Sequence, residues 1–169
     1  QAVAAAAGLI SLAGGGARAS AVIDSLIDAD ISDATVQTTG KLLVVSEGLM
    51  RADALVQATA VSLGAIAAAA SGTVTLIELN PEISAGIRSS KVRAAEVDIK
   101  ALGRQTGRAE TESISVSTGV SVGVSSATVD DRARVVAGLG NGVDLQATRL
   151  NIDVNSKDYL DVKSVAATG

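Results

Sequence analysis

Twelve consecutive residues read Ser113-Ile-Ser-Val-Ser-Thr-Gly-Val-Ser-Val-Gly-Val124. Ile, Val or Thr occupies every second position of this stretch, and Ser or Gly occupies the positions between. A period of two, with β-branched residues on one face, is typical of a β-strand and does not fit the 3.6-residue period of a helix. The stretch therefore predicts a strand, both for itself and for any segment that repeats it.

The chain repeats a similar order of residues three times. A glycine inside an apolar run recurs at Gly8, Gly64 and Gly119, so the spacings are 56 and 55 residues. Behind each glycine, apolar anchors keep their places while the charges between them change. The anchor sets are Ile31, Ile87 and Leu139; Val36, Val92 and Leu145; Leu42, Val97 and Leu150; Val44, Ile99 and Ile152. A repeat of this length predicts a stacked architecture, with approximate repeats 3–58, 59–113 and 114–169.

The Ala-rich run 65–70 would be assigned to a helix on propensity alone, because Ala has the highest helix propensity. The repeat favours a strand instead, since equivalent positions of a stacked protein share one conformation. Turn-forming residues separate the expected strands at 14–16, 39–40, 71–72, 80–81, 89–90 and 138–142. The single proline, Pro81, stands in one of these turns, where it disrupts no strand.

The composition predicts a narrow core. The chain has no Phe or Trp and one Tyr, Tyr159, so Ala, Val, Ile and Leu must fill the interior. We expect an all-β fold, a right-handed parallel β-helix (a solenoid) of three repeats of about 55 residues, forming one domain over 1–169. Each repeat is expected to supply two or three coils of about 20 residues, giving a rod roughly 35–40 Å long. An antiparallel β-sandwich is the alternative, disfavoured because sandwiches lack such repetition and usually use aromatic core residues.

Several function classes are excluded by the residue counts. The chain has no Cys and no His, which removes disulfides, thiol nucleophiles, Ser-His-Asp triads and the common zinc and haem ligand sets. The net charge of -4 and the pI near 4.8 argue against nucleic acid or an anionic membrane as a partner. The longest apolar stretch, 2–17, is too short and too weakly hydrophobic for a membrane span.

One family resemblance is carried by the stretch Ala85-Gly-Ile87-Arg-Ser-Ser90-Lys-Val92-Arg-Ala94-Ala-Glu-Val97-Asp-Ile99-Lys-Ala101. It resembles the tandem β-helix repeats of large secreted bacterial surface proteins, the leukotoxin-like and haemagglutinin-like adhesins. Looser matches start at Asp30 and Ala137, so the resemblance covers most of the chain. Its motifs are architectural. The resemblance implies a β-helix at the cell surface or outside the cell, and it carries over no catalytic residues.

A cluster of acids, Asp28, Asp30 and Asp33, is a candidate Ca²⁺ site, because carboxylate oxygens are the ligands that Ca²⁺ prefers. The glycine and the twelfth-position Glu of an EF-hand loop are both missing, and so is the nonapeptide of calcium β-rolls. The alternative interpretation is a set of solvated turn acids. No other cofactor is expected.

Two pairs of carboxylates are candidates for glycosidase-type acid/base chemistry, which uses two acids that flank the scissile bond. The pairs are Asp130-Asp131, beside Arg132 and Arg134, and Glu110 with Glu112. Sites that cleave sugars usually also need aromatic platforms, and the chain has one Tyr and no Trp. We therefore expect that the protein is not an enzyme.

The middle repeat is locally basic. Its cations are Arg88, Lys91, Arg93, Lys100, Arg104 and Arg108. They form either a stripe for an anionic polymer or an ordinary solvated surface. The equivalent positions Lys41, Glu96 and Arg149 alternate in sign, which favours solvated outward positions.

A glycine-rich stretch, Gly138, Gly140 and Gly142, could be mistaken for a phosphate-binding loop. A dinucleotide fingerprint has different glycine spacing and is followed by a helix. No helix is expected after these glycines, so they predict a turn between coils.

The ends of the chain are expected to lack caps. A β-helix leaves open backbone edges that natural proteins cover with a helix or loop, and no amphipathic helix is evident at either terminus. Residues 1–8 read like a repeat under way and residues 162–169 like the start of another. We expect a processed mature form, a segment of a longer protein, or copies that stack end to end.

These expectations combine into a structural function: a β-helical stalk or repeat segment of a secreted surface adhesin or extracellular matrix protein. Its expected partners are further copies of the repeat or itself, with a surface glycan or a host or cell-surface ligand as a further candidate. A self-assembling extracellular filament or sheath subunit is the alternative. A polysaccharide-active enzyme that uses an acidic cleft is the least favoured reading.

Overall fold

Eleven β-strands make up the computed structural model, which describes all residues 1–169 and has no helix. The strands are β1 (Ala2–Ala7), β2 (Ile10–Ile23), β3 (Leu26–Ser32), β4 (Thr35–Gln37), β5 (Lys41–Leu63), β6 (Ile66–Leu79), β7 (Glu82–Arg88), β8 (Lys91–Ser117), β9 (Val120–Asp131), β10 (Arg134–Leu139) and β11 (Asp144–Thr168). The chain therefore contains no helix that is long and apolar enough to cross a membrane. The all-β prediction is confirmed, and the Ala-rich run lies in β6 apart from its first residue.

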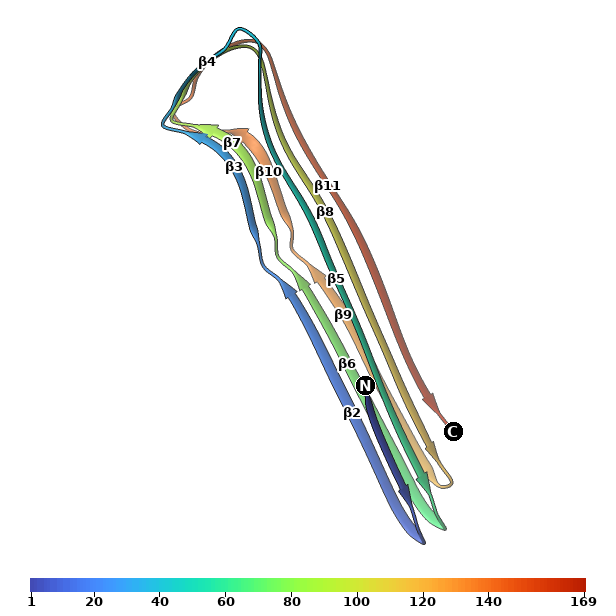
Figure 1. Cartoon of the computed structure of the whole chain (residues 1–169). Coiled ribbons are helices and arrows are strands. Elements are labelled where there is room, and N and C mark those ends of the chain that lie inside the picture. The colour runs from blue at the N-terminus through green and yellow to red at the C-terminus, as the bar shows by residue number, and fades with distance from the viewer.

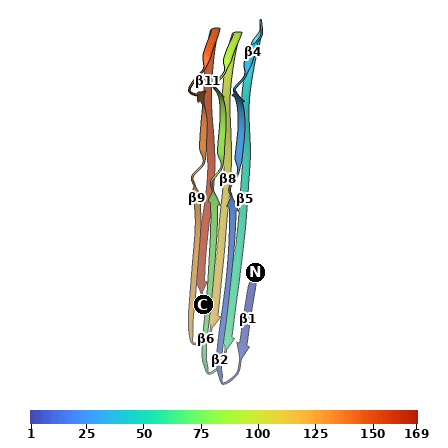
Figure 2. The same ribbon diagram turned by 90° about the vertical axis from the view of Figure 1, so that its left-hand side faces the viewer.

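Every strand pair is parallel, and the strands form three sheets. Sheet A has the order β1-β5-β8-β11, with β4 also paired to β8; sheet B is β2-β6-β9; sheet C is β10-β7-β3. The chain passes through sheets B, C and A in turn and then returns to sheet B beside its own earlier strand. We call 10–63, 66–117 and 120–168 the first, second and third coils (Figures 1 and 2).

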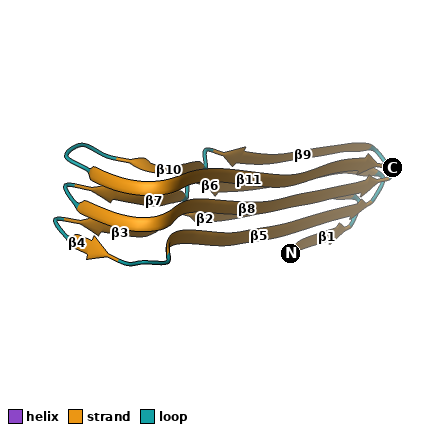
Figure 3. Cartoon of the chain, turned by 90° about the horizontal axis from the view of Figure 1, so that it is seen from above, coloured by secondary structure: helices purple, strands orange, loops and turns teal.

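Each coil is long and flat (Figures 1 and 3). Sheets A and B pack face to face, and they meet at the narrow tip, which comprises the turns 8–9, 64–65 and 118–119 and the strand residues beside them. Sheet C and β4 form the wide end, where the two layers are farther apart (Figure 1). With a rise of about 3.3 Å per residue, β8 is about 90 Å long, whereas three coils at about 4.8 Å spacing are only about 10 Å high.

The expectation of two or three short coils per repeat is wrong, because each repeat forms one coil. The expected turns at 14–16 and 71–72 lie inside β2 and β6. Small residues there mark close approach of two sheets rather than chain reversal: a Cβ at Gly15 would lie 3.1 Å from the carbonyl oxygen of Thr59 in the facing sheet. The protein is thus a wide, thin slab of three coils and not a rod 35–40 Å long.

The remaining turn predictions agree with the structure. Breaks between strands fall at 39–40, 80–81 and 89–90. Of the predicted turn 138–142, only residues 140–142 lie between strands, since Gly138 and Leu139 belong to β10. The repeated glycines Gly64 and Gly119 lie in the tip turns. A Cβ on either would collide with a backbone carbonyl of the neighbouring coil, which explains a glycine at each recurrence of the turn.

The registers confirm the predicted anchor sets. The paired rows are Ile31-Ile87-Leu139, Val36-Val92-Leu145, Leu42-Val97-Leu150 and Val44-Ile99-Ile152. On the outer face of sheet A, Glu96 is paired with both Lys41 and Arg149, and their charged atoms lie 3.9 and 3.8 Å apart. The alternation of charge seen in the sequence is thus a ladder of opposite charges that crosses all three coils.

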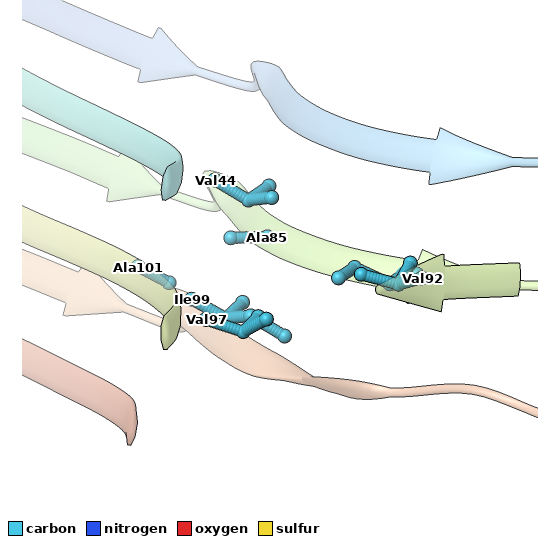
Figure 4. Packing of buried hydrophobic residues seen from close by; sticks show 7 residues of the cluster. Val44, Ala85, Val92, Val97, Ile99 and Ala101 are labelled. Carbon is cyan, nitrogen blue, oxygen red and sulfur yellow. The ribbon is translucent and has the colours of Figure 1, made fainter. Parts of the chain in front are cut away.

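The core becomes smaller from the wide end to the tip. At the wide end, seven buried residues pack into one cluster (Figure 4): Val44, Ala85, Ile87, Val92, Val97, Ile99 and Ala101. A middle cluster holds Ala52, Ile77, Leu79 and Ala109. The cluster nearest the tip contains only Ala13, Ala60 and Ala69. The sheets approach as the side chains between them shrink.

The tip carries hydroxyl groups inside and aliphatic groups outside. Ser71 faces inward and its Oγ lies 2.7 Å from that of Ser113 and 2.8 Å from that of Ser115. Ser11 and Ser62 form a similar pair, with their Oγ atoms 2.7 Å apart. The β-branched positions of the alternating stretch point outward, so the face that reads as apolar in the sequence is the surface at the tip.

Candidate functional site

A groove of about 270 Å³ lies on the outer face of sheet C. Asp28 and Asp30 lie in it side by side, because residues two apart in a strand share a face. Ser84 Oγ donates to Asp28 Oδ1 over 2.6 Å, and the Arg88 Nε lies 2.7 Å from Asp30 Oδ2. Gly86, which pairs with Asp30, has no side chain and leaves the groove open.

The third acid of the predicted calcium site lies outside this groove. Asp33 stands in the turn after β3 with a φ of 51°, a left-handed conformation that Asp tolerates in turns. No group of three His, Cys, Asp or Glu residues lies close enough together to hold a metal ion. Only Asp28 and Asp30 share the groove, and both have protein partners. Calcium binding at Asp28, Asp30 and Asp33 stays a prediction that rests on two of the three carboxylates.

The two carboxylate pairs proposed for acid/base chemistry lie apart. Glu110 and Glu112 are on the outer face of sheet A, whereas Asp130 is on the outer face of sheet B. Lys163 Nζ donates to Glu110 Oε1 over 2.8 Å, which lowers the pKa of Glu110 below its ordinary value. Gln57 Nε2 donates to Glu112 over 2.9 Å. A carboxylate with a lowered pKa, such as Glu110, is a poor general acid.

Asp131 is a partly buried carboxylate whose pKa is raised above its ordinary value. It occupies an inward position at the end of β9, in register with the fully buried Leu79. Burial raises its pKa, the backbone N–H of Ala133 opposes this with a hydrogen bond of 3.0 Å, and the charges of Asp158 and Asp130 raise it further. Its Oδ2 is buried without a hydrogen-bond partner. The surroundings of Asp131 therefore favour its neutral form more than water does.

An ion pair between an exposed lysine and a buried carboxylate was missed by sequence reasoning. Asp98 is only 3% exposed, and Lys41 Nζ covers it at 2.5 Å from Oδ2. The hydrogen bond between them raises the pKa of Lys41 and lowers that of Asp98. The N–H groups of Ala95 and Glu96 both donate to the carbonyl of Gly40, as in a β-bulge, and the register shifts by one residue there. A charged residue between Val97 and Ile99 was the available signal.

The basic residues of the middle repeat do not form one stripe. Arg88 lies in the sheet C groove, whereas Lys91 and Arg93 line a second groove of about 190 Å³ at the wide end. Lys100, Arg104 and Arg108 lie on the outer face of sheet A. Arg108 is 3.4 Å from Glu110 and 3.6 Å from Asp161. Acidic neighbours therefore offset several of these charges, and no single basic surface is built.

The turn predicted at the glycines of the third repeat is present only in part, since Gly138 lies in β10, and it joins sheets C and A within the third coil and not two coils. Gly140 and Gly142 lie between β10 and β11, and Gly142 has a φ of +72° that favours glycine. The segment that follows is a strand, so a phosphate-binding loop ahead of a helix is not formed. No protein family, no curated protein and no solved structure matches the chain.

Proposed function

We propose that this chain is a structural unit, a repeat segment of a right-handed parallel β-helix that serves as a stalk in a secreted bacterial adhesin or extracellular matrix protein. The observation that carries the proposal is the in-register recurrence of one coil three times, with apolar rows inside and opposite charges outside. The resemblance of 85–101 to the repeats of large surface adhesins supports an extracellular location. No catalytic step is part of this role.

The mechanical argument starts from the backbone. Within the strands there are 89 backbone hydrogen bonds, and because the paired strands come from successive coils these bonds run along the stack axis. Each contributes a net 0.5–1.5 kcal/mol, roughly, and a pull along the axis loads many of them at once. Register is fixed by charge as well, since Arg108 lies between Asp53 and Asp161 on the outer face of sheet A.

Tandem concatemers of the chain test this proposal. Two, four and eight copies joined in frame should appear in negative-stain electron microscopy as flat particles of constant width, which we call blades. Their length should increase by about 14 Å per copy, because each copy adds three coils at about 4.8 Å. Separate particles joined by flexible linkers would overturn the stalk proposal. A tag on the copy far from a membrane anchor should also react with antibody on intact cells if the segment is displayed outside.

The bare faces of the outer coils favour a second candidate, a filament or sheath subunit. Leu150 and Ile152 occupy inward rows yet are 41% and 43% exposed, whereas Val97 and Ile99 in the same rows are fully buried. Another coil with the same rows would cover them, supplied by the same polypeptide or by a second chain. Electron microscopy of the isolated chain at rising concentration separates the two: fibres support the filament, and a persistent single blade supports the stalk.

A further inference from the structure

An apolar surface covers the outer face of sheet B near the narrow tip. Its largest side chains are well exposed: Ile10 72%, Leu12 76%, Ile66 67%, Val120 65%, Val122 51% and Val124 60%. The first charged residue along β2 is Arg18, so this surface holds no charge. Scattered exposed aliphatic residues are ordinary on proteins, but a contiguous apolar area of this kind marks an interaction site. We call these six residues, with the small residues between them, the tip face.

The relief of the tip face follows from the register. Three rows cross it, Leu12-Ala68-Val120, Gly14-Ala70-Val122 and Gly16-Gly72-Val124. In the last two rows the side chains grow from none in the first coil to valine in the third coil. The first coil therefore presents a trough at Gly14 and Gly16, and the third coil presents a ridge at Val122 and Val124.

We propose that the tip face pairs with the tip face of a second copy of this chain. The two copies are related by a two-fold axis that lies between the faces and runs approximately along β6, with the strands of each copy inclined to it by about 15°, half the usual crossing angle of packed sheets. Such an axis reverses the order of the coils and keeps the level along the strand. The valine ridge of each copy then lies over the glycine trough of the other, and Ala70 and Gly72 of the two copies meet at the centre. The row Leu12-Ala68-Val120 does not share this relief, because Leu12 of one copy lies over Val120 of the other beside the central contact.

The available area sets the strength of this pairing. The outer face of sheet B over the 14 residues of β2 measures about 46 by 14 Å, or roughly 650 Å². Stable dimers bury about 800 Å² per partner, so one three-coil chain supplies a weak interface with an apolar centre and a polar rim. Packed sheets cross at about 30°, which moves the two Glu78 side chains, about 20 Å from the centre, some 10 Å apart. Their repulsion is then screened.

This contact differs from end-to-end stacking and does not rest on the proposed function. It uses the outer surface of sheet B, whereas stacking uses the open edges of the outer coils. It would join blades side by side, and each added copy of the repeat would strengthen it by multivalency.

Sedimentation velocity over a range of chain concentrations tests the pairing. The unmodified chain should form a dimer that dissociates on dilution. Val122→Lys with Val124→Lys places cations in the trough of the partner and should weaken the dimer about tenfold or more. Leu55→Lys is the matched control: Leu55 is 61% exposed on sheet A, so its replacement should leave the dimer unchanged. A chain that is monomeric throughout, or equal weakening by both changes, would overturn the proposal.

Exchanging glycine and valine between the first and third coils distinguishes this geometry from non-specific association. Gly14→Val with Gly16→Val adds apolar surface, and the sites can accept it, because no atom lies within 3.8 Å of a Cβ at either position. Filling the trough should nevertheless weaken the dimer about tenfold or more, since two ridges then clash. Adding Val122→Gly and Val124→Gly moves the ridge to the first coil and should restore the dimer. Stronger dimerisation by the first pair alone would show non-specific association and contradict the two-fold arrangement.

Discussion

The wide end and the narrow tip fill the space between their facing sheets with opposite kinds of side chain. At the wide end, Ile87, Val92 and Ile99 are fully buried, and the outer face of sheet C carries acids and a base. At the tip, Ser71 and Ser113 are inside and Val122 and Val124 are outside. The difference follows from the separation of the sheets. Branched aliphatic side chains fill a wide interior, whereas at the tip only Gly, Ala and Ser fit, and their hydroxyls pair with one another.

The transition between the two regions is built from glycines that face inward. A Cβ on Gly48 would lie 2.6 Å from Ile83 Cδ1, and a Cβ on Gly103 would lie 2.7 Å from Val135 Cγ2. These two glycines pair with each other in sheet A. Large side chains from sheet C therefore extend into space that the glycines leave, and the sheets can draw together beyond that point.

The largest expected effect is on the free energy of unfolding, when the same substitution, Ile to Ala, is made once in each region. Ile99→Ala at the wide end removes a fully buried side chain and should cost about 2–5 kcal/mol of the free energy of unfolding. Ile66→Ala at the tip removes an outward side chain and should change it by less than about 0.5 kcal/mol. Urea unfolding at low protein concentration measures both. Similar losses would mean that the tip face is buried in the monomer.

The next prediction concerns the polar interior of the tip. Ser71→Val adds volume where the sheets approach most closely and leaves Ser113 and Ser115 without one hydroxyl partner. It should destabilise the chain by about 1–3 kcal/mol although Val is the stronger strand former. Ser71→Ala is the control, which removes the hydroxyl without adding bulk and should cost about 1 kcal/mol. Stabilisation by Ser71→Val would contradict a tip whose thickness is set by small side chains.

A smaller change in stability is expected when two glycines are replaced by alanine, with a gain at the outward-facing glycine and a loss at the inward-facing one. Gly138→Ala on the outer face of sheet C meets no atom within 4 Å and should stabilise the protein by about 0.4–1 kcal/mol, since the unfolded chain loses freedom. Gly103→Ala faces inward and should destabilise it, because Val135 must move. Thermal unfolding midpoints of the two variants, compared with the unmodified chain, give the signs. A gain at both positions would show that the interior near Gly103 is loose.

The smallest expected effect is a change in how the stability of the protein depends on pH. Burial raises the folded-state pKa of Asp131 above its ordinary value of 3.8, so its charged form costs stability at neutral pH and the cost disappears as pH falls through that pKa. Asp131→Asn should therefore raise the unfolding midpoint at about pH 7 and make little difference at about pH 3.

Glu110→Gln is the matched control for this pH dependence, because the hydrogen bond from Lys163 lowers the pKa of Glu110. Its contribution to stability is present above the ordinary pKa of 4.5 and is lost as pH falls through the folded-state value. Glu110→Gln should thus lower the midpoint at neutral pH and lose its effect in acid. The same sign for both variants at neutral pH would contradict the environments described for the two carboxylates.

Much of the fold was predictable because the repeat provides an internal alignment. The anchors Ile31, Ile87 and Leu139 were placed in one row from spacing alone, and the register confirms it. The same comparison assigned the Ala-rich run to a strand against its helix propensity. Coil length was not predictable, since Gly14–Gly16 and Ser71-Gly72 use the residues that turns use. A glycine that ends a strand and a glycine that lets two sheets approach are identical in one dimension.

The groove and the buried charges were predictable only in part. Asp28 and Asp30 were selected as neighbours in sequence, and the strand places them together. Asp33 was grouped with them by the same proximity, but the turn takes it elsewhere. The pairing of Lys41 with Asp98 joins residues of different coils at a bulge, which no local pattern specifies.

The sequence by itself determined that the chain is made of parallel-stacked strands, which residues share a row, and that the core contains no rings. Period and repeat length are properties of the chain, so they can be read without coordinates. Only the tertiary structure decided which of the two faces of the strands is inside at the narrow tip. Alternation places Ser and Val on opposite sides at Ser113–Val124, but the spacing between sheets A and B selects the side that is buried. At the tip that spacing admits only the smaller set, and the valines are left on the surface.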